Sequence, residues 1–293
     1  MNRVSLFLMG RKGYVVIRDI ICNGYAAMIE QVVIAHDKNM KNDYYDEMLY
    51  ECKKSSIAVY DKKDKYEIAS EYCFAIAWRW LIPLNNSTKL IVLHDSLLPK
   101  YRGFSPLVNM LINREPFIGV TAIFACKAFD EGDIIVQRKT PVLYPIKITD
   151  AINQITPLYS EIVCEILEKV SNGLELMSKP QVEADSSYSL WRDENDYRID
   201  WNESSEYIQQ FIFSVGYPFK GASTIVNGMI IRIHDCIIVN DVFIENRQHG
   251  KVLFVENGCP VVVCNLGLLK ITEASYEDGT NFLPLNRLRL RFQ

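Results

Sequence analysis

The sequence predicts an α/β fold with a Rossmann-like, mostly parallel sheet and helices on both faces, followed by a small C-terminal β-barrel-like domain. In the first part of the chain, short apolar runs alternate with stretches of helical periodicity, which is typical of a parallel sheet. Further along, short β-type runs are separated by Asn-Gly pairs, which favour hairpins. A polar segment rich in serine lies between these parts. We therefore expect domains over residues 1–177 and 203–293, joined by a linker and hinge over 178–202.

The first domain contains the expected strands and helices in alternation. Asn23-Gly24 ends the first helix, and Pro106 after Ser105 begins a later one. The segment 10–13 lacks both the GxGxxG and the Walker patterns, so we interpret it as an ordinary strand-to-helix turn instead of a phosphate loop. The expected strands are 4–9, 31–35, 57–60, 73–78, 90–93, 119–124 and 134–137, and the expected helices are 14–22, 43–54, 66–70, 105–113 and 149–170.

The C-terminal part begins with one expected helix and continues with short strands. The helix covers 203–213, and the strands cover 223–226, 229–233, 250–255, 260–264 and 268–272. Arg287, Arg289 and Arg291 alternate with leucines, which places the arginines on one solvated face of a terminal strand. An exposed edge of this sheet is where a homodimer would form.

Composition narrows the class of protein. The 293 residues are 49% hydrophobic, which is enough for a core, and the net charge of −4 disfavours a broad nucleic-acid-binding surface. The eight cysteines form no CxxC pair and the four histidines are scattered, so we expect neither a disulfide framework nor a metal site. No apolar run approaches the roughly 20 residues that span a membrane. We expect a cytoplasmic protein.

Two residues suggest proton-transfer chemistry. His94 ends the apolar run 89–93, and Asp130 begins an acidic glycine turn between two expected strands. Ligand crevices in such sheets lie at the carboxyl ends of the strands. A carboxylate beside a histidine fixes its tautomer and stabilises its cation. The alternative is a surface histidine and an ordinary turn.

A longer string of residues resembles a known family. It comprises His94-x-Ser-Leu-Leu-Pro-x-Tyr-Arg-Gly103, Gly119-Val-Thr121 and Asp130-x-Gly-Asp-Ile134. This order is similar to the catalytic core of 10-formyltetrahydrofolate-dependent formyltransferases. Gly216-Tyr-Pro-Phe-Lys-Gly-Ala222 resembles a segment of sugar-nucleotide N-formyltransferases. The resemblance implies formyl transfer from 10-formyltetrahydrofolate to a nucleotide-linked amino sugar, such as a dTDP-amino-dideoxyhexose for surface polysaccharide. Methionyl-tRNA formyltransferase is the alternative within the family.

The resemblance also implies roles for individual residues. His94 and Asp130 would be catalytic, and no metal is implied. The folate would lie against Trp80, Leu81, Ile82, Cys126, Lys127, Ala128 and Phe129. The amino-sugar substrate would contact Ser96, Tyr101, Arg102 and Tyr217.

Val92 departs from the family pattern, which usually has asparagine two residues before the histidine. Valine cannot donate a hydrogen bond to the oxyanion, and losing one such donor costs about 2.7–4 kcal/mol. Another donor, such as Ser96 or a backbone N–H, could replace it, or the reaction could be slower. The chain could also be a catalytically silent protein that binds folate or a sugar nucleotide. Asp95 is a second departure, since proline or glycine is usual after the histidine.

Overall fold

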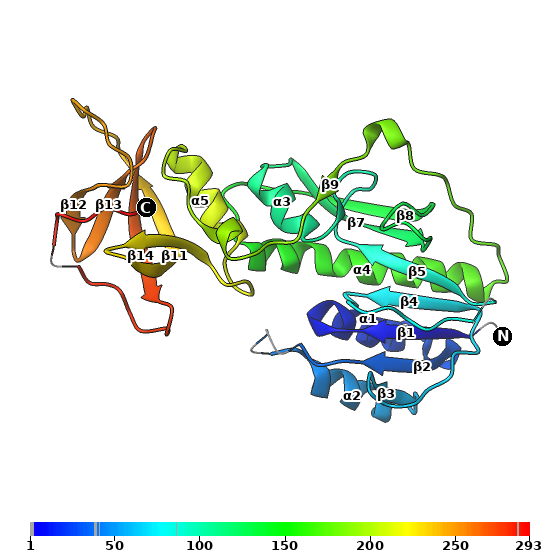
Figure 1. Ribbon diagram of the computed structural model, residues 1–293. Coiled ribbons are helices and arrows are strands. Elements are labelled where there is room, and N and C mark those ends of the chain that lie inside the picture. Colours follow the sequence, from blue (N-terminus) through cyan, green and yellow to red (C-terminus); the bar gives the residue numbers. More distant parts are fainter. Residues whose placement is uncertain (1–2, 38–39, 41, 86, 286) are drawn as a thin grey trace. The chain divides into compact units, whose positions relative to one another are not determined.

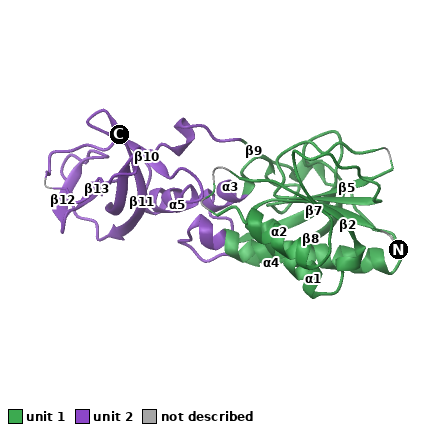
Figure 2. Cartoon of the chain, turned by 90° about the horizontal axis from the view of Figure 1, so that it is seen from below, with its two compact units in different colours: residues 1–106, 117–141, 152–190 green, residues 107–116, 142–151, 191–293 purple. Residues whose placement is uncertain are grey.

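A computed structural model describes residues 3–37, 40, 42–85, 87–285 and 287–293. The chain divides into two units (Figure 2). The first comprises Met1–Pro106, Phe117–Pro141 and Ile152–Leu190, and the second comprises Leu107–Pro116, Val142–Ala151 and Trp191–Gln293. The contiguous domains expected at 1–177 and 203–293 stay a prediction. Within the described residues, no helix combines the length and apolar character needed to cross a membrane.

The first unit is built on a seven-stranded sheet with the order β3-β2-β1-β4-β5-β7-β8 (Figure 1). The strands from β3 to β5 are parallel, whereas β7 runs antiparallel to both β5 and β8. This confirms the mostly parallel sheet. The bounds are β1 (Val4–Leu8), β2 (Ile29–Ile34), β3 (Val59–Asp61), β4 (Tyr72–Ile76), β5 (Lys89–His94), β7 (Phe117–Phe124) and β8 (Ile134–Pro141).

Among the described residues, four α-helices lie before residue 200. They are α1 (Gly10–Cys22), α2 (Tyr45–Lys54), α3 (Pro106–Ile112) and α4 (Ile148–Ser171). The first helix begins four residues earlier than expected, so the segment 10–13 is its first turn. Gly13 is closely packed within this turn, because a Cβ there would lie 2.9 Å from the Cβ of Leu8 and 3.2 Å from the Sδ of Met48. The glycine lets α1 approach β1 and α2 closely.

The helix expected over 66–70 does not form. These residues are irregular, because tertiary contacts replace the helical ones. The carbonyl of Glu67 accepts a hydrogen bond of 2.6 Å from the Gln31 side chain. The ring of Tyr66 packs edge-on against Phe7, with the ring centroids 5.7 Å apart. Packing on the sheet therefore overrides the local helical preference.

The second unit contains α5 (Ser205–Ser214) and a five-stranded antiparallel sheet ordered β10-β11-β14-β13-β12. The last residues of the chain connect the two edges of this sheet. The N–H of Phe292 donates to Gly250 O at 2.7 Å, just before β12, and the N–H of Ile225 in β10 donates to Gln293 O at 2.7 Å. These bonds give the sheet its expected barrel-like character. The strands are β10 (Ala222–Val226), β11 (Met229–Val239), β12 (Val252–Glu256), β13 (Cys259–Val263) and β14 (Leu268–Tyr276).

Candidate active site

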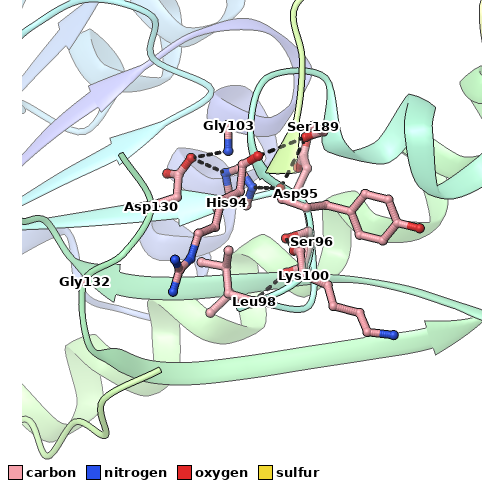
Figure 3. Close-up of polar contacts among 12 residues, drawn as sticks. His94, Asp95, Ser96, Leu98, Lys100, Gly103, Asp130, Gly132 and Ser189 are labelled. Carbon is pink, nitrogen blue, oxygen red and sulfur yellow. Dashed lines mark hydrogen bonds and ion pairs between the residues drawn. The ribbon is translucent and has the colours of Figure 1, made fainter. Parts of the chain in front are cut away.

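His94 is the last residue of β5, at the carboxyl edge of the parallel strands, and is 8% exposed. Its Nε2 atom lies 2.8 Å from Tyr101 O, and its Nδ1 atom lies 3.5 Å from Asp130 Oδ2 (Figure 3). A neutral imidazole can donate from only one nitrogen. The shorter contact therefore selects the form protonated at Nε2, which leaves the lone pair of Nδ1 facing the carboxylate. A proton gained at Nδ1 would be stabilised by Asp130.

Asp130 lies in the loop between β7 and β8, and its side chain is 17% exposed. Its Oδ2 atom accepts a hydrogen bond of 2.9 Å from Gly103 N (Figure 3). The loop is folded tightly against β7, because a Cβ on Gly132 would lie 1.6 Å from Phe124 O. Only glycine fits at this position. The close approach of residue 132 to Phe124 therefore brings together the two ends of the loop that contains Asp130.

The turn after His94 is fixed by hydrogen bonds from within the protein. The hydroxyl of Ser96 is fully buried and donates to Lys100 O at 2.7 Å. Thr121 donates to Ser96 O at 2.6 Å and accepts from Gln137 Nε2 at 2.8 Å. Ser96 therefore holds the turn, and its expected contact with substrate stays a prediction.

Asp95 anchors the end of β5 to two helices. It forms an ion pair with Lys12 of α1, with side chains 20% and 14% exposed, and accepts a hydrogen bond from Tyr159 of α4. Burial by itself would raise the pKa of the Asp95 carboxyl, but the Lys12 charge and the two hydrogen bonds outweigh it and hold the pKa below its usual value. Burial, together with the Asp95 charge, raises the pKa of Tyr159 well above its ordinary value. The phenol therefore remains a donor.

Residues 179–189, which we call the strap, run beside the site. Lys179 pairs with Ile134 through two backbone hydrogen bonds of 2.8 and 2.9 Å. At the other end β9 (Tyr188–Ser189) pairs in parallel with β6 (Arg102–Gly103). The sequence predicts a linker here, yet the strap contacts the loops on both sides of His94.

Arg102 connects the strap to the loop after β5. Its side chain is only 1% exposed, and its Nη1 atom lies 2.9 Å from Glu183 Oε2 and 3.1 Å from the Tyr188 hydroxyl. Its Nε atom donates to Gln181 Oε1 at 3.1 Å, and Glu131 lies 3.7 Å from Nη1. With its donors directed at the protein, Arg102 is placed to hold the strap. The expected contact of Arg102 with substrate stays a prediction.

The segments expected to hold folate are exposed. Trp80 is 38% exposed with Lys62 Nζ 3.5 Å from its ring centroid, and Leu81 and Phe129 are 96% and 76% exposed. Ile82 is partly buried, whereas Cys126, Lys127 and Ala128 are exposed. These segments follow β4 and β7, which flank β5 in the sheet. Exposed aromatic and apolar side chains suit stacking against a flat heteroaromatic ring.

Two further observations concern the substrate residue expected at Tyr217 and the side chains of metal-ligating type among the described residues. Tyr217, expected to contact substrate, is 48% exposed and belongs to the second unit. Among the residues that the structure describes, no three His, Cys, Asp or Glu side chains gather where they could hold a metal ion.

Val92 shares the face of β5 with His94 and is partly buried. It packs in an apolar cluster with Leu98, Ile123 and Ile134, which we call the Val92 cluster. The position that usually carries the donor amide is therefore filled by an apolar contact. The structure does not reveal a replacement side-chain donor at Ser96, since that hydroxyl already donates to Lys100.

Comparison with known proteins identifies the family of the chain. The N-terminal domain of the formyl transferase family matches residues 50–166, and its C-terminal domain matches residues 192–283. The chain belongs to the formyl transferase family. The chain is 28% identical over 191 residues to methionyl-tRNA formyltransferase of Ruminiclostridium cellulolyticum, covering 64% of this chain and 60% of the relative. It is 30% identical over 178 residues to that of Lactococcus lactis, covering 61% of this chain and 55% of the relative. The matches thus span less than two thirds of these relatives.

Solved structures share the fold of this chain. WlaRD, a sugar 3N-formyl transferase crystallised with dTDP and 5-N-formyl-THF, is 19% identical with a TM-score of 0.71, covering 98% of this chain and 99% of the other. The Helicobacter canadensis N-formyltransferase, in complex with folinic acid and dTDP-3-aminofucose, is 17% identical with a TM-score of 0.72, covering 94% and 100%. HypX from Aquifex aeolicus with tetrahydrofolic acid is 17% identical with a TM-score of 0.65, covering 94% and 44%.

Sequence reasoning thus anticipated the meeting of His94 with Asp130, whose catalytic roles stay predictions. It missed the polar side chains that surround this pair. Gln181 and Ser189 lie in a segment without periodicity, so nothing in the sequence separates them from solvent-exposed residues. The contacts of Lys12 and Tyr159 with Asp95 could not be predicted from the sequence either. Asp95 itself stood out as a departure from the family pattern.

Proposed function

We propose that this formyl transferase moves the formyl group of 10-formyltetrahydrofolate to the primary amine of a nucleotide-linked amino sugar. The observation that carries the proposal is the contact between His94 and Asp130 at the carboxyl end of β5. The exposed segments around Trp80 and Phe129 on either side of that strand support a site for the folate.

The reaction forms a C–N bond between the amine and the formyl carbon, and it breaks the bond from that carbon to N10 of the folate. The proton that the amine loses is returned to N10 as tetrahydrofolate leaves. With Nε2–H held by Tyr101 O, Nδ1 of His94 is the basic nitrogen, and Asp130 stabilises the imidazolium that forms there. In the absence of an asparagine at Val92, backbone N–H groups of the flanking loops are our candidates for the oxyanion donors.

An amino sugar is favoured over methionyl-tRNA by three observations. Structural superposition on the two sugar N-formyltransferases covers 98% and 94% of this chain and 99% and 100% of theirs, and the segment Gly216-Tyr-Pro-Phe-Lys-Gly-Ala222 resembles one found in that class. The net charge of −4 is also unfavourable for the many phosphate contacts that tRNA requires. We therefore favour a dTDP-amino-dideoxyhexose for surface polysaccharide, used in the cytoplasm. The eight cysteines, all free, fit a reducing compartment.

The test is to incubate the protein with 10-formyltetrahydrofolate and a panel of dTDP-amino sugars, and to follow the formamide product by mass spectrometry. His94→Gln should abolish turnover. His249→Gln is the matched control, since His249 lies in the second unit with Asn202 as its partner.

Two other results would replace the proposal. Formylation of methionyl-tRNA, with binding that weakens steeply as salt increases, would identify the tRNA enzyme, which the sequence relatives favour. Binding of folate without turnover of any amine would identify a binding protein, as the apolar contact at Val92 allows.

A further inference from the structure

The strap contacts the backbone that presents the carboxylate to His94. The side-chain amide of Gln181 donates from Nε2 to Asp130 O at 2.7 Å and to Gly132 O at 2.8 Å. Its Oε1 accepts from Arg102 Nε at 3.1 Å. A flipped amide would turn its oxygen toward two carbonyls and its donors toward a guanidinium, so this orientation is the one the surroundings allow. Gln181 thus links the buried Arg102 to the loop of Asp130.

The other end of the strap contacts the second partner of His94. Ser187 Oγ accepts from Tyr101 N at 3.0 Å. Ser189 Oγ lies 3.4 Å from Tyr101 O, the same carbonyl that faces His94 Nε2, and 3.2 Å from Arg102 O. The strap therefore holds the groups that face both nitrogens of the imidazole.

The backbone at both partners is strained. Asp130 has φ of 58° and Tyr101 has φ of 61°, in the left-handed region that residues with a side chain rarely adopt. Such conformations persist where the surroundings impose them. Both residues are contacted by the strap, and a Cβ on Gly103 would lie 2.6 Å from Ser189 O, which shows how closely the strap approaches.

We infer that the strap is a positioning element for His94, in which Gln181 sets Asp130 and the serines Ser187 and Ser189 set the Tyr101 carbonyl. This inference rests on the proposed formyl transfer for its effect on rate. Arg102, buried between Gln181 and Glu183, holds the strap in register. None of these residues needs to touch substrate, because each acts through the two groups that fix the ring of His94.

The experiment compares Gln181→Glu and Gln181→Met with Val182→Ala as the control. Glutamate retains an acceptor for Arg102 but loses the donors to the two carbonyls, and methionine loses both functions. Val182 is 59% exposed in the same segment, so its truncation leaves these contacts intact. For both Gln181 variants we expect kcat to fall roughly 10-fold to 100-fold, with KM for the folate within about threefold, since a displacement of about 1 Å has effects of this size.

A second readout does not depend on turnover. Long-range ¹H–¹⁵N spectra report the tautomer of each of the four histidines. Wild type should show His94 protonated at Nε2, and the Gln181 variants should show a mixture of tautomers. Ser187→Ala, which removes an exposed hydroxyl and should fold normally, should shift the same His94 signals.

The outcomes distinguish failure of the positioning role of the strap from failure of the proposed function. Wild-type kcat and an unchanged His94 spectrum in Gln181→Glu and Ser187→Ala would refute the positioning role. If wild type turns over no amine, the proposed function fails, and the His94 spectra alone decide whether the strap positions the ring. A loss of affinity for folate at unchanged kcat would place Gln181 in ligand binding and would also overturn the inference.

Discussion

Replacing Lys12 with methionine removes the cation that faces Asp95 while keeping a chain of similar length. In the native protein burial would raise the pKa of the Asp95 carboxyl, but the lysine charge and the hydrogen bonds from Lys12 and Tyr159 together outweigh burial and lower that pKa. In Lys12→Met burial prevails, so the carboxylate next to His94 becomes an uncompensated charge. Tyr159 continues to donate one hydrogen bond to it.

The expected loss of stability in Lys12→Met depends on how far Lys12 and Asp95 are exposed to solvent. Breaking a fully buried ion pair costs about 3–5 kcal/mol. The two side chains retain 14% and 20% exposure, and the phenol keeps part of the charge satisfied. We therefore expect the free energy of unfolding to fall by about 2–3 kcal/mol near neutral pH.

The pH dependence has a definite sign. In wild type the lowered pKa of Asp95 gives stability that is present above its unfolded pKa of about 3.9 and is lost as pH falls through the folded value. In Lys12→Met the folded carboxyl binds its proton more readily than the unfolded one, so the variant recovers stability as pH falls. Urea unfolding at about pH 7.5 and about pH 5 should therefore show a smaller penalty at the lower pH.

The neighbouring Arg11→Met variant is the control for loss of one positive charge. Arg11 is exposed and contacts Asn153, so its removal should cost about 0–1 kcal/mol at either pH. If Lys12→Met costs no more than Arg11→Met, or costs the same at both pH values, the electrostatic account of Asp95 is wrong.

Three further substitutions test the site. Asp130→Asn removes the charge beside His94 and should lower kcat for formamide formation roughly 100-fold to 10,000-fold with folate binding unchanged in a fluorescence titration; a loss below about tenfold would contradict its role. Val92→Asn should leave kcat unchanged or raise it, while urea unfolding reports a loss of about 1–3 kcal/mol from an amide in the Val92 cluster; a large drop in kcat would mean that the pocket is rebuilt around valine. Gly132→Ala brings a Cβ within 1.6 Å of Phe124 O, so both the melting temperature by circular dichroism and kcat should fall, and wild-type values would show that the loop has room.

The sheet could be predicted because its strands are continuous apolar runs with glycine and polar residues between them. The position of His94 followed from the same pattern, since a polar residue after a buried strand lies at the sheet edge. The close packing of α1 could not be predicted from periodicity, because the small volume of Gly13 matters only when α2 is packed beside it.

The polar contacts of the site were less accessible to sequence reasoning. Ser96 and Arg102 have side chains suited to bind a ligand, but both are buried and bonded to the protein. Burial of a polar residue depends on segments far along the chain, such as Glu183, which is 81 residues from Arg102. The contacts of Gln181 depend on the same distant packing and leave no periodic signal.

The strap also affects the order in which the site around His94 forms during folding and the way in which it is disrupted on unfolding. Its contacts close chain loops of about 80 residues, which is slow relative to pairing of neighbouring strands. The central sheet can thus form before His94 acquires its partners. In the native state the exposed strap is also a candidate for local opening at lower free energy than the sheet. Mild denaturant or limited proteolysis should therefore release the partners of His94 while the central sheet remains intact.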